Sequence, residues 1–146
     1  MMSEGQIRLA TGTDSDCLAK IYLQSRIASG SFSSGKALKT EDFFNDTLEE
    51  EVYVYERNQR IVGFISIYQP DLFIHLLFVH PDYFGQGIGK ELLTFAKSKY
   101  GLPLTLKCLV KNQKAQHFYE HLGFVREEKV KTGLVNHDYY IYCLRK

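Results

Sequence analysis

The feature that most constrains the fold of this chain is an apolar run that leads through a glycine-rich turn into a helical pattern. The run from Leu72 to Val79 predicts a buried strand, and the apolar spacing from Gly87 to Tyr100 predicts a helix. Gly85, Gly87 and Gly89 let backbone N–H groups approach a ligand that a Cβ would hold away. The start of the helix adds unpaired amides and the positive end of its dipole. The segment therefore predicts an anion site suited to a phosphate or diphosphate.

Two common nucleotide loops do not fit this turn. A Walker A loop needs a first glycine where this chain has Phe84, and a Ser or Thr where it has Glu91. A Rossmann fingerprint has the spacing GxGxxG near the start of a βαβ unit, whereas this turn reads GxGxG and follows a predicted hairpin. The phosphate ligand is therefore of another kind.

The remaining periodic segments predict one mixed α/β domain over residues 1–146. The expected order is β-α-α-β-β-β-α-β-α-β-β. The predicted strands are 7–10, 52–56, 60–68, 72–79, 104–110, 124–130 and 139–144, and the predicted helices are 15–28, 40–48, 87–100 and one capped by Asn112 and ended by Gly123.

Composition and charge exclude several classes of function. Eighteen basic and seventeen acidic side chains leave a formal net charge of +1, so no basic excess indicates a nucleic-acid partner. No stretch approaches the ~20 apolar residues of a membrane helix, and the N-terminus lacks the pattern of a signal peptide. The three cysteines lie far apart, which predicts neither a disulfide framework nor a metal site. We expect a cytoplasmic protein, a monomer or homodimer, that needs no metal and binds no membrane.

Two blocks of the sequence resemble the GNAT (Gcn5-related N-acetyltransferase) superfamily. The first reads Leu77-Phe-Val79-His-Pro81 and then Phe84-Gly-Gln-Gly87-Ile-Gly89, similar to the family's Leu-x-Val-x-Pro and Arg/Gln-x-x-Gly-x-Gly/Ala. The second is similar to Asn-x-x-Ala-x-x-Phe/Leu-Tyr-x-x-x-Gly-Phe, and its residues are Asn112, Ala115, Phe118, Tyr119, Gly123 and Phe124. The resemblance implies a GNAT fold with a mixed, mostly antiparallel seven-stranded sheet and about four helices. It also implies an enzyme that transfers an acetyl group from acetyl-CoA to a primary amine of a small molecule or peptide.

The resemblance also implies which residues bind the cofactor. The pantetheine arm would pair with the backbone of Phe78 and Val79, and Asn112 would hydrogen-bond it. The other reading of Asn112 is a helix cap only, and both roles can hold at once. Phe84 stands where the family has Arg or Gln, so it keeps the amide and loses a side-chain contact, which Gln86 or Lys90 would supply. The diphosphate would lie on the amides of Phe84, Gly85, Gln86, Gly87, Ile88, Gly89 and Lys90.

Two side chains are candidates for proton transfer. Tyr119 resembles the family's general acid, since a phenol near the sulfur can protonate the departing CoA thiolate; the other reading is a core aromatic. Histidine is the side chain suited to a base that takes a proton from the attacking ammonium, which makes His75 the second candidate; the other reading is a satisfied core or edge histidine. By the period of a strand, His75 shares a face with Phe73, Leu77 and Val79.

The acceptor amine is not named by the sequence. The resemblance places substrate selection in residues 22–39 and 131–138, and neither segment carries the carboxylate cluster that would select a polyamine. The acidic run from Asp42 to Glu51 is interpreted as a solvated face. A non-catalytic module that senses CoA or acetyl-CoA is the alternative function, mildly favoured by Phe84, whereas Tyr119 and the Asn112 block favour an enzyme.

Overall fold

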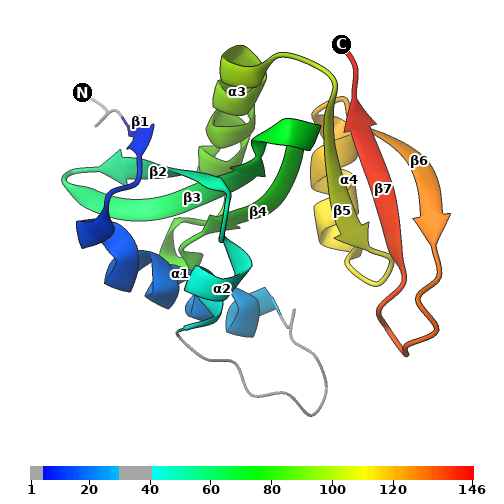
Figure 1. Cartoon of the computed structure of the whole chain (residues 1–146), viewed down its shortest axis with the longest axis horizontal. Helices are drawn as coiled ribbons and strands as arrows, with labels where there is room; N and C mark the ends of the chain where they lie inside the picture. The colour runs from blue at the N-terminus through cyan, green and yellow to red at the C-terminus, as the bar shows by residue number, and fades with distance from the viewer. Residues whose placement is uncertain (1–4, 30–40) are drawn as a thin grey trace.

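The computed structural model describes residues 5–29 and 41–146, and it contains one seven-stranded sheet (Figure 1). The strand order is β1-β2-β3-β4-β5-β7-β6, and only β4 and β5 run parallel. This confirms the predicted α/β class and the predicted order of elements. The strands are β1 (Gln6–Leu9), β2 (Glu51–Arg57), β3 (Arg60–Tyr68), β4 (Phe73–Val79), β5 (Leu104–Leu109), β6 (Val125–Val130) and β7 (Tyr139–Leu144), and the helices are α1 (Ser15–Ser29), α2 (Asp42–Asp46), α3 (Ile88–Tyr100) and α4 (Gln113–His121).

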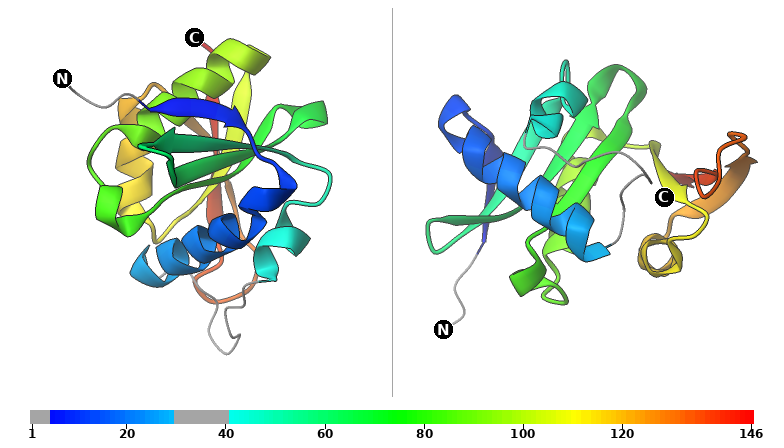
Figure 2. Two further views of the ribbon diagram at one scale, coloured as in Figure 1. Left: turned by 90° about the vertical axis from the view of Figure 1, so that its left-hand side faces the viewer. Right: turned by 90° about the horizontal axis from the view of Figure 1, so that it is seen from below.

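Helices cover both faces of the sheet. Successive side chains of a strand point to opposite faces, so each strand contributes to the packing on both sides. In β2, Val54 packs with α1 and α2, whereas Tyr53 and Tyr55 pack with α3 on the opposite face. Figure 2 shows α1 and α3 on opposite sides of β2, β3 and β4. The central strand β3 is buried on both faces, as its continuous apolar sequence predicts.

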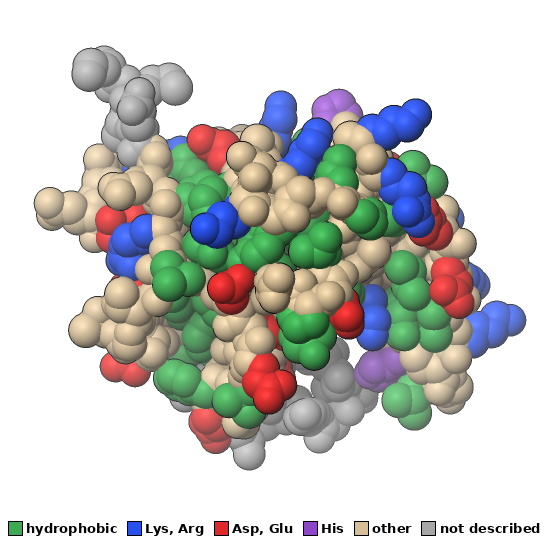
Figure 3. All heavy atoms as spheres, turned by 45° about the horizontal axis from the view of Figure 1, so that its top comes forward, with side chains coloured by type: hydrophobic (Ala, Val, Ile, Leu, Met, Phe, Trp, Pro, Cys, Tyr) green, Lys and Arg blue, Asp and Glu red, His purple; other side chains and the backbone are tan. Residues whose placement is uncertain are grey.

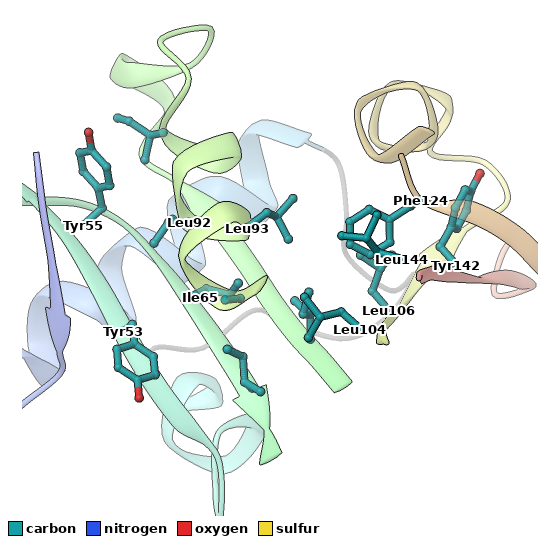
Figure 4. Close-up of a cluster of buried hydrophobic side chains, with 14 of the residues drawn as sticks. Tyr53, Tyr55, Ile65, Leu92, Leu93, Leu104, Leu106, Phe124, Tyr142 and Leu144 are labelled. Atoms are coloured by element: carbon teal, nitrogen blue, oxygen red, sulfur yellow. The ribbon is translucent and has the colours of Figure 1, made fainter. Parts of the chain in front are cut away.

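The larger core lies under α3 and continues across β5 to β7. Figure 4 shows Leu92 and Leu93 of α3 above the sheet, with Leu104 of β5 beside them. Leu92 and Leu104 are fully buried. This core fixes α3, and therefore the glycine turn that precedes it, against the ends of β3 and β4.

The face predicted for His75 is right for Phe73, on which its ring stacks, and wrong for Leu77 and Val79, because β4 contains a β-bulge at His75. Ser66 of β3 pairs with Leu76, but the next residue, Ile67, pairs with Ile74, so His75 has no partner in the ladder. Ile74 and Leu77 pack in the same core although they are three residues apart. The extra residue reverses the alternation, so Leu77 and Val79 do not share the face of His75.

The acidic run from Asp42 to Glu51 is not a solvated face, contrary to the sequence interpretation. Asp42 pairs with Arg26, Asp46 accepts from Tyr22, Glu50 pairs with His75, and Glu51 accepts from Tyr100. The helix that would have displayed the run ends at Asp46 instead of reaching Leu48. Its carboxylates therefore point in different directions. The predicted helix start at Thr40 lies outside the described residues.

A partly buried ion pair joins β1 to the residue that precedes α1. Arg8 Nη1 lies 2.8 Å from Asp14 Oδ2, and Arg8 Nη2 lies 3.1 Å from Glu56 Oε2 on β2. The Thr11 N–H also donates to Asp14. Hydrogen bonding from Arg8 is the largest cause that lowers the pKa of Asp14 to about 2, against the opposing effect of burial.

We expect Asp14→Asn to destabilise the fold by about 1–2 kcal/mol at neutral pH. Because the folded pKa lies below the unfolded value, this stability is present above about pH 4 and is lost as the pH falls toward 2. Urea denaturation at pH 7 and pH 2.5 should show the difference from wild type shrinking at the lower pH. Glu127→Gln, which removes an exposed pair with Arg145, is the control and should change little. A difference for Asp14→Asn that is equal at both pH values would contradict the argument.

Candidate active site

The candidate site begins where β4 and β5 stop pairing. Their register consists of Phe73 with Thr105 and Ile74 with Leu106, and beyond these pairs the strands diverge (Figure 1). β4 remains paired with β3 as far as Val79. The other edge of β4 therefore has backbone groups without a β5 partner from His75 onward.

The hydrogen bonds show which residues turn their backbone to this open edge. The His80 N–H donates to the Val62 carbonyl of β3, and alternation then directs the backbone groups of Leu77 and Val79 away from β3. The Val79 carbonyl accepts from the Ser25 hydroxyl of α1 at 3.0 Å. Phe78 differs from its sequence prediction, because its carbonyl faces Gly63 of β3 and its ring packs on Tyr22. The open edge thus offers Leu77 and Val79, not Phe78.

The glycine turn follows β4 and leads into α3. Gly85 and Gly87 have φ angles of +79° and +81°, which glycine adopts without strain. A Cβ added at either position would meet no heavy atom within 4 Å, so both positions border open space. Gly89 is different, since a Cβ there would come within 3.1 Å of Phe118 Cζ. The first two glycines fit the approach of a ligand, and Gly89 fits the close packing of α4.

A hydrogen bond that the sequence did not predict joins the glycine turn to β2. Arg57 Nη1 donates to Gln86 Oε1 at 2.6 Å, so the Gln86 side chain is held toward β2. The exposed side chains near the turn include Phe84, of which half is accessible, and Lys90. No motif contains Arg57, and only the pairing of β2 with β3 brings it to the turn.

Helix α4, which carries Tyr119, is capped at both of its ends. The Asn112 side chain accepts from the Ala115 N–H at 3.2 Å, which confirms the predicted cap. At the other end Gly123 has a φ of +100°, and the Phe124 N–H donates to the Tyr119 carbonyl at 3.0 Å in a Schellman arrangement. The cap uses the side-chain oxygen of Asn112 and leaves its NH₂ group for a ligand.

Tyr119 packs as an aromatic and keeps an unused hydroxyl. Its ring lies 5.8 Å from that of Phe124 and 6.4 Å from that of Tyr142. Burial is the main cause that raises the pKa of the Tyr119 phenol well above its ordinary value, with a smaller effect of Cys108. Within residues 5–29 and 41–146 no group hydrogen-bonds the hydroxyl. The Tyr119 phenol is therefore protonated at neutral pH.

His75 lies at the point where β4 leaves β5. Its Nδ1 is 2.5 Å from Glu50 Oε2, and its ring stacks on Phe73 with a centroid distance of 6.2 Å. His75 and Tyr119 lie on opposite sides of the opening between β4 and β5. His75 belongs to β4, whereas Tyr119 belongs to α4, which is held at the end of β5 by hydrogen bonds from the Gln116 side chain to the backbone. Sequence reasoning missed Glu50, whose only signal was the acidic run.

The described part of the chain contains no group of three or more His, Cys, Asp or Glu side chains arranged to hold a metal ion. It also contains no helix long and apolar enough to cross a membrane. Figure 3 shows basic and acidic side chains interspersed over one face of the molecule.

Comparison with known proteins decides the family. The sequence model of the acetyltransferase (GNAT) domain matches residues 49–126. This chain belongs to the GNAT family. The match runs from β2 to the start of β6 and so includes the open edge of β4, the glycine turn and Tyr119.

Individual GNAT relatives are similar over part of the chain. The peptidyl-lysine N-acetyltransferase YiaC of Escherichia coli is 35% identical over 72 residues, which are 49% of this chain and 48% of that protein. The uncharacterized N-acetyltransferase MJ1207 of Methanocaldococcus jannaschii is 34% identical over 99 residues, covering 59% and 44%. The matched regions thus span about half the length of these curated relatives.

Solved structures share the fold along nearly the whole chain. The apo form of YjaB from Escherichia coli is 25% identical, has a TM-score of 0.77 and covers 97% of both chains. The PaiA N-acetyltransferase of Thermoplasma acidophilum, solved in complex with coenzyme A, is 20% identical with a TM-score of 0.77 and covers 98% and 99%.

Proposed function

We propose that this chain transfers the acetyl group of acetyl-CoA to a primary amine of a small molecule or peptide. The observation that carries the proposal is the open edge of β4 leading into two left-handed glycines that border empty space. Two relatives support it by their descriptions. YncA of Salmonella typhimurium was solved with its cofactor acetyl-CoA, and YiaC is named a peptidyl-lysine N-acetyltransferase.

The residues present fit acetyl-CoA. Backbone groups of Leu77 and Val79 face the open edge, where a pantetheine arm would pair as a strand does. The amides from Phe84 to Lys90, at the start of α3, would bind the diphosphate. The NH₂ group of Asn112 would bond the arm while its oxygen keeps the cap.

Acetyl-CoA supplies an activated thioester, and the residues of the chain move the protons. His75 takes a proton from the acceptor ammonium, so that the neutral amine can attack the acetyl carbonyl. The Leu77 N–H, which faces the open edge, stabilises the charge that develops on the carbonyl oxygen. As the C–N bond forms and the C–S bond breaks, the nitrogen loses its second proton to solvent, and Tyr119 donates its own proton to the departing sulfur. Solvent returns Tyr119 and His75 to their starting states.

The test is the release of CoA thiol from acetyl-CoA in the presence of amines, amino acids and lysine peptides. We expect release that depends on both the protein and one class of amine, with the acetylated amine detected by mass spectrometry. Tight binding of acetyl-CoA without thiol release for any amine would instead establish the CoA sensor. Absence of binding would overturn both functions.

We expect the activity to be independent of metal ions. Aminolysis of a thioester needs an acid, a base and an oxyanion donor, and His75, Tyr119 and the Leu77 N–H would supply them. Thiol release should keep its rate after dialysis against EDTA. Activity that is lost to EDTA and restored by zinc or magnesium would contradict this prediction.

The working state is also a proposal. We expect a cytoplasmic protein that acts as a monomer or homodimer on an amine substrate, without a membrane or a nucleic acid. Size-exclusion chromatography with light scattering measures the oligomeric state, and binding assays with DNA and RNA at low salt should be negative.

A further inference from the structure

Glu50 is a buried carboxylate that the chain aims at β4 through an unusual turn. The preceding residue, Glu49, adopts a φ of 66°, a left-handed conformation that is uncommon for a residue other than glycine. The Glu50 N–H donates to the Thr47 carbonyl at 3.0 Å, which closes the turn. The Glu50 side chain is only 9% exposed. A left-handed residue thus places a charged group where solvent barely reaches it.

The carboxylate of Glu50 is only half satisfied. Oε2 lies 2.5 Å from His75 Nδ1, whereas Oε1 is buried and has no hydrogen-bond partner among the residues that the structure describes. A buried acceptor without a partner costs about 1–3 kcal/mol, and more when it is charged. Folding alone does not explain why this position carries a carboxylate.

The imidazole of His75 is bound on one side and open on the other. Its side chain is 36% exposed, although Glu50 holds Nδ1 and the Phe73 ring stacks on its plane. Within the described chain no group hydrogen-bonds Nε2. His75 is also the bulged residue at the end of the β4–β5 pairing, so it borders the open edge.

We propose that Glu50 is a positioning residue for His75; this rests on the proposed acetyl transfer with His75 as its base. Glu50 accepts the Nδ1–H hydrogen bond, which fixes the tautomer that carries a lone pair on Nε2. Nε2 takes one proton from the acceptor ammonium, and the resulting imidazolium is stabilised by the adjacent carboxylate. The proton leaves to solvent after the C–N bond has formed, and Glu50 itself stays ionised throughout.

A positive charge lies near the ring that stacks on His75. Lys107 of β5 places its Nζ 5.7 Å from the centroid of the Phe73 ring. Protonation of His75 would add a second positive charge to this part of β4, and an anion beside the imidazole offsets such a charge. Glu50 is the carboxylate in contact with His75 and supplies that anion.

A mutant cycle tests the proposal. Glu50→Ala should lower kcat about 10–100-fold and leave KM for acetyl-CoA nearly unchanged. His75→Ala should lose at least as much, and the double variant should be no slower than His75→Ala, because residues that act as a unit are not additive. Glu50→Gln keeps an acceptor oxygen for the Nδ1–H and should lose less than Glu50→Ala. Glu51→Gln is the matched control; it removes the charge of the neighbouring carboxylate, which accepts from the Tyr100 hydroxyl, and it should keep the wild-type kcat.

A spectroscopic readout separates positioning from simple structural support. In ¹⁵N NMR the His75 ring of the wild type should show a protonated Nδ1 and an unprotonated Nε2 at pH 8, and Glu50→Ala should give a mixture of tautomers. Losses that multiply in the double variant, or a Glu50→Gln variant as slow as His75→Ala, would overturn the proposal. A wild type without turnover for any amine would refute the proposed function, whereas a wild-type tautomer that persists in Glu50→Ala would refute the positioning role alone.

Discussion

Replacing Gly87 with valine should abolish the binding of CoA while the protein remains folded. Gly87 has a φ of +81°, where a β-branched residue is strained, and relief of the strain would rotate the neighbouring amides away from the diphosphate. Nothing lies within 4 Å of the position that its Cβ would take, so the added side chain would occupy the space proposed for the ligand. Calorimetric titration with CoA should show at least a 100-fold loss of affinity, equivalent to about 2.7 kcal/mol.

Gly101 provides the control for this experiment. It has a φ of +80° and open space around its Cβ position, but it lies at the far end of α3. Gly101→Val should therefore suffer comparable strain and a lower Tm, with CoA affinity retained. A Gly87→Val variant that binds CoA as the wild type does would remove the glycine turn from the proposed site.

Replacing Tyr119 with phenylalanine should lower kcat by about 10²–10⁴-fold, the usual contribution of a general acid. The expected effect on stability is small, because the hydroxyl has no hydrogen-bond partner in the described chain and the ring contacts with Phe124 are kept. CoA affinity should also change little. The measurement is single-turnover acetyl transfer to the best amine, alongside thermal unfolding and CoA titration.

Tyr142 is the matched control for Tyr119, since their rings lie 6.4 Å apart in the same core. The Tyr142 hydroxyl donates to Glu120 at 2.5 Å, so Tyr142→Phe should lower stability and leave the chemical step unchanged. If Tyr119→Phe transfers acetyl at the wild-type rate with chemistry rate-limiting, then water or the substrate supplies the proton.

Local patterns predicted most of the fold. The period of apolar residues gave the strands and helices, and the ends of α4 followed from the cap at Asn112 and the glycine at 123. These features depend on residues within one or two turns of one another, so a sequence contains them directly. The glycine turn was predictable for the same reason.

Features created by pairing between distant segments were not predictable. The bulge at His75 depends on Ser66, whose hydroxyl accepts from the Leu76 N–H at 3.1 Å across ten residues. That single shift changes which side chains share the face of His75. The partnership of Glu50 with His75, across 25 residues, likewise has no local signature.

The brief pairing of β4 with β5 has a consequence for how the molecule responds to its ligand. The β4–β5 register is limited to Phe73 and Ile74, with a hydrogen bond from the Thr105 N–H to the Leu72 carbonyl beside it, so the β5–β7–β6 unit is joined to the described rest of the sheet by a short ladder. A pantetheine arm bound along β4 would lie between β4 and β5 and would restrain the β5–β7–β6 unit relative to the rest of the sheet. Amide hydrogen exchange should then slow in β4 and β5 together when CoA is added, while β1 at the distant edge keeps its rate.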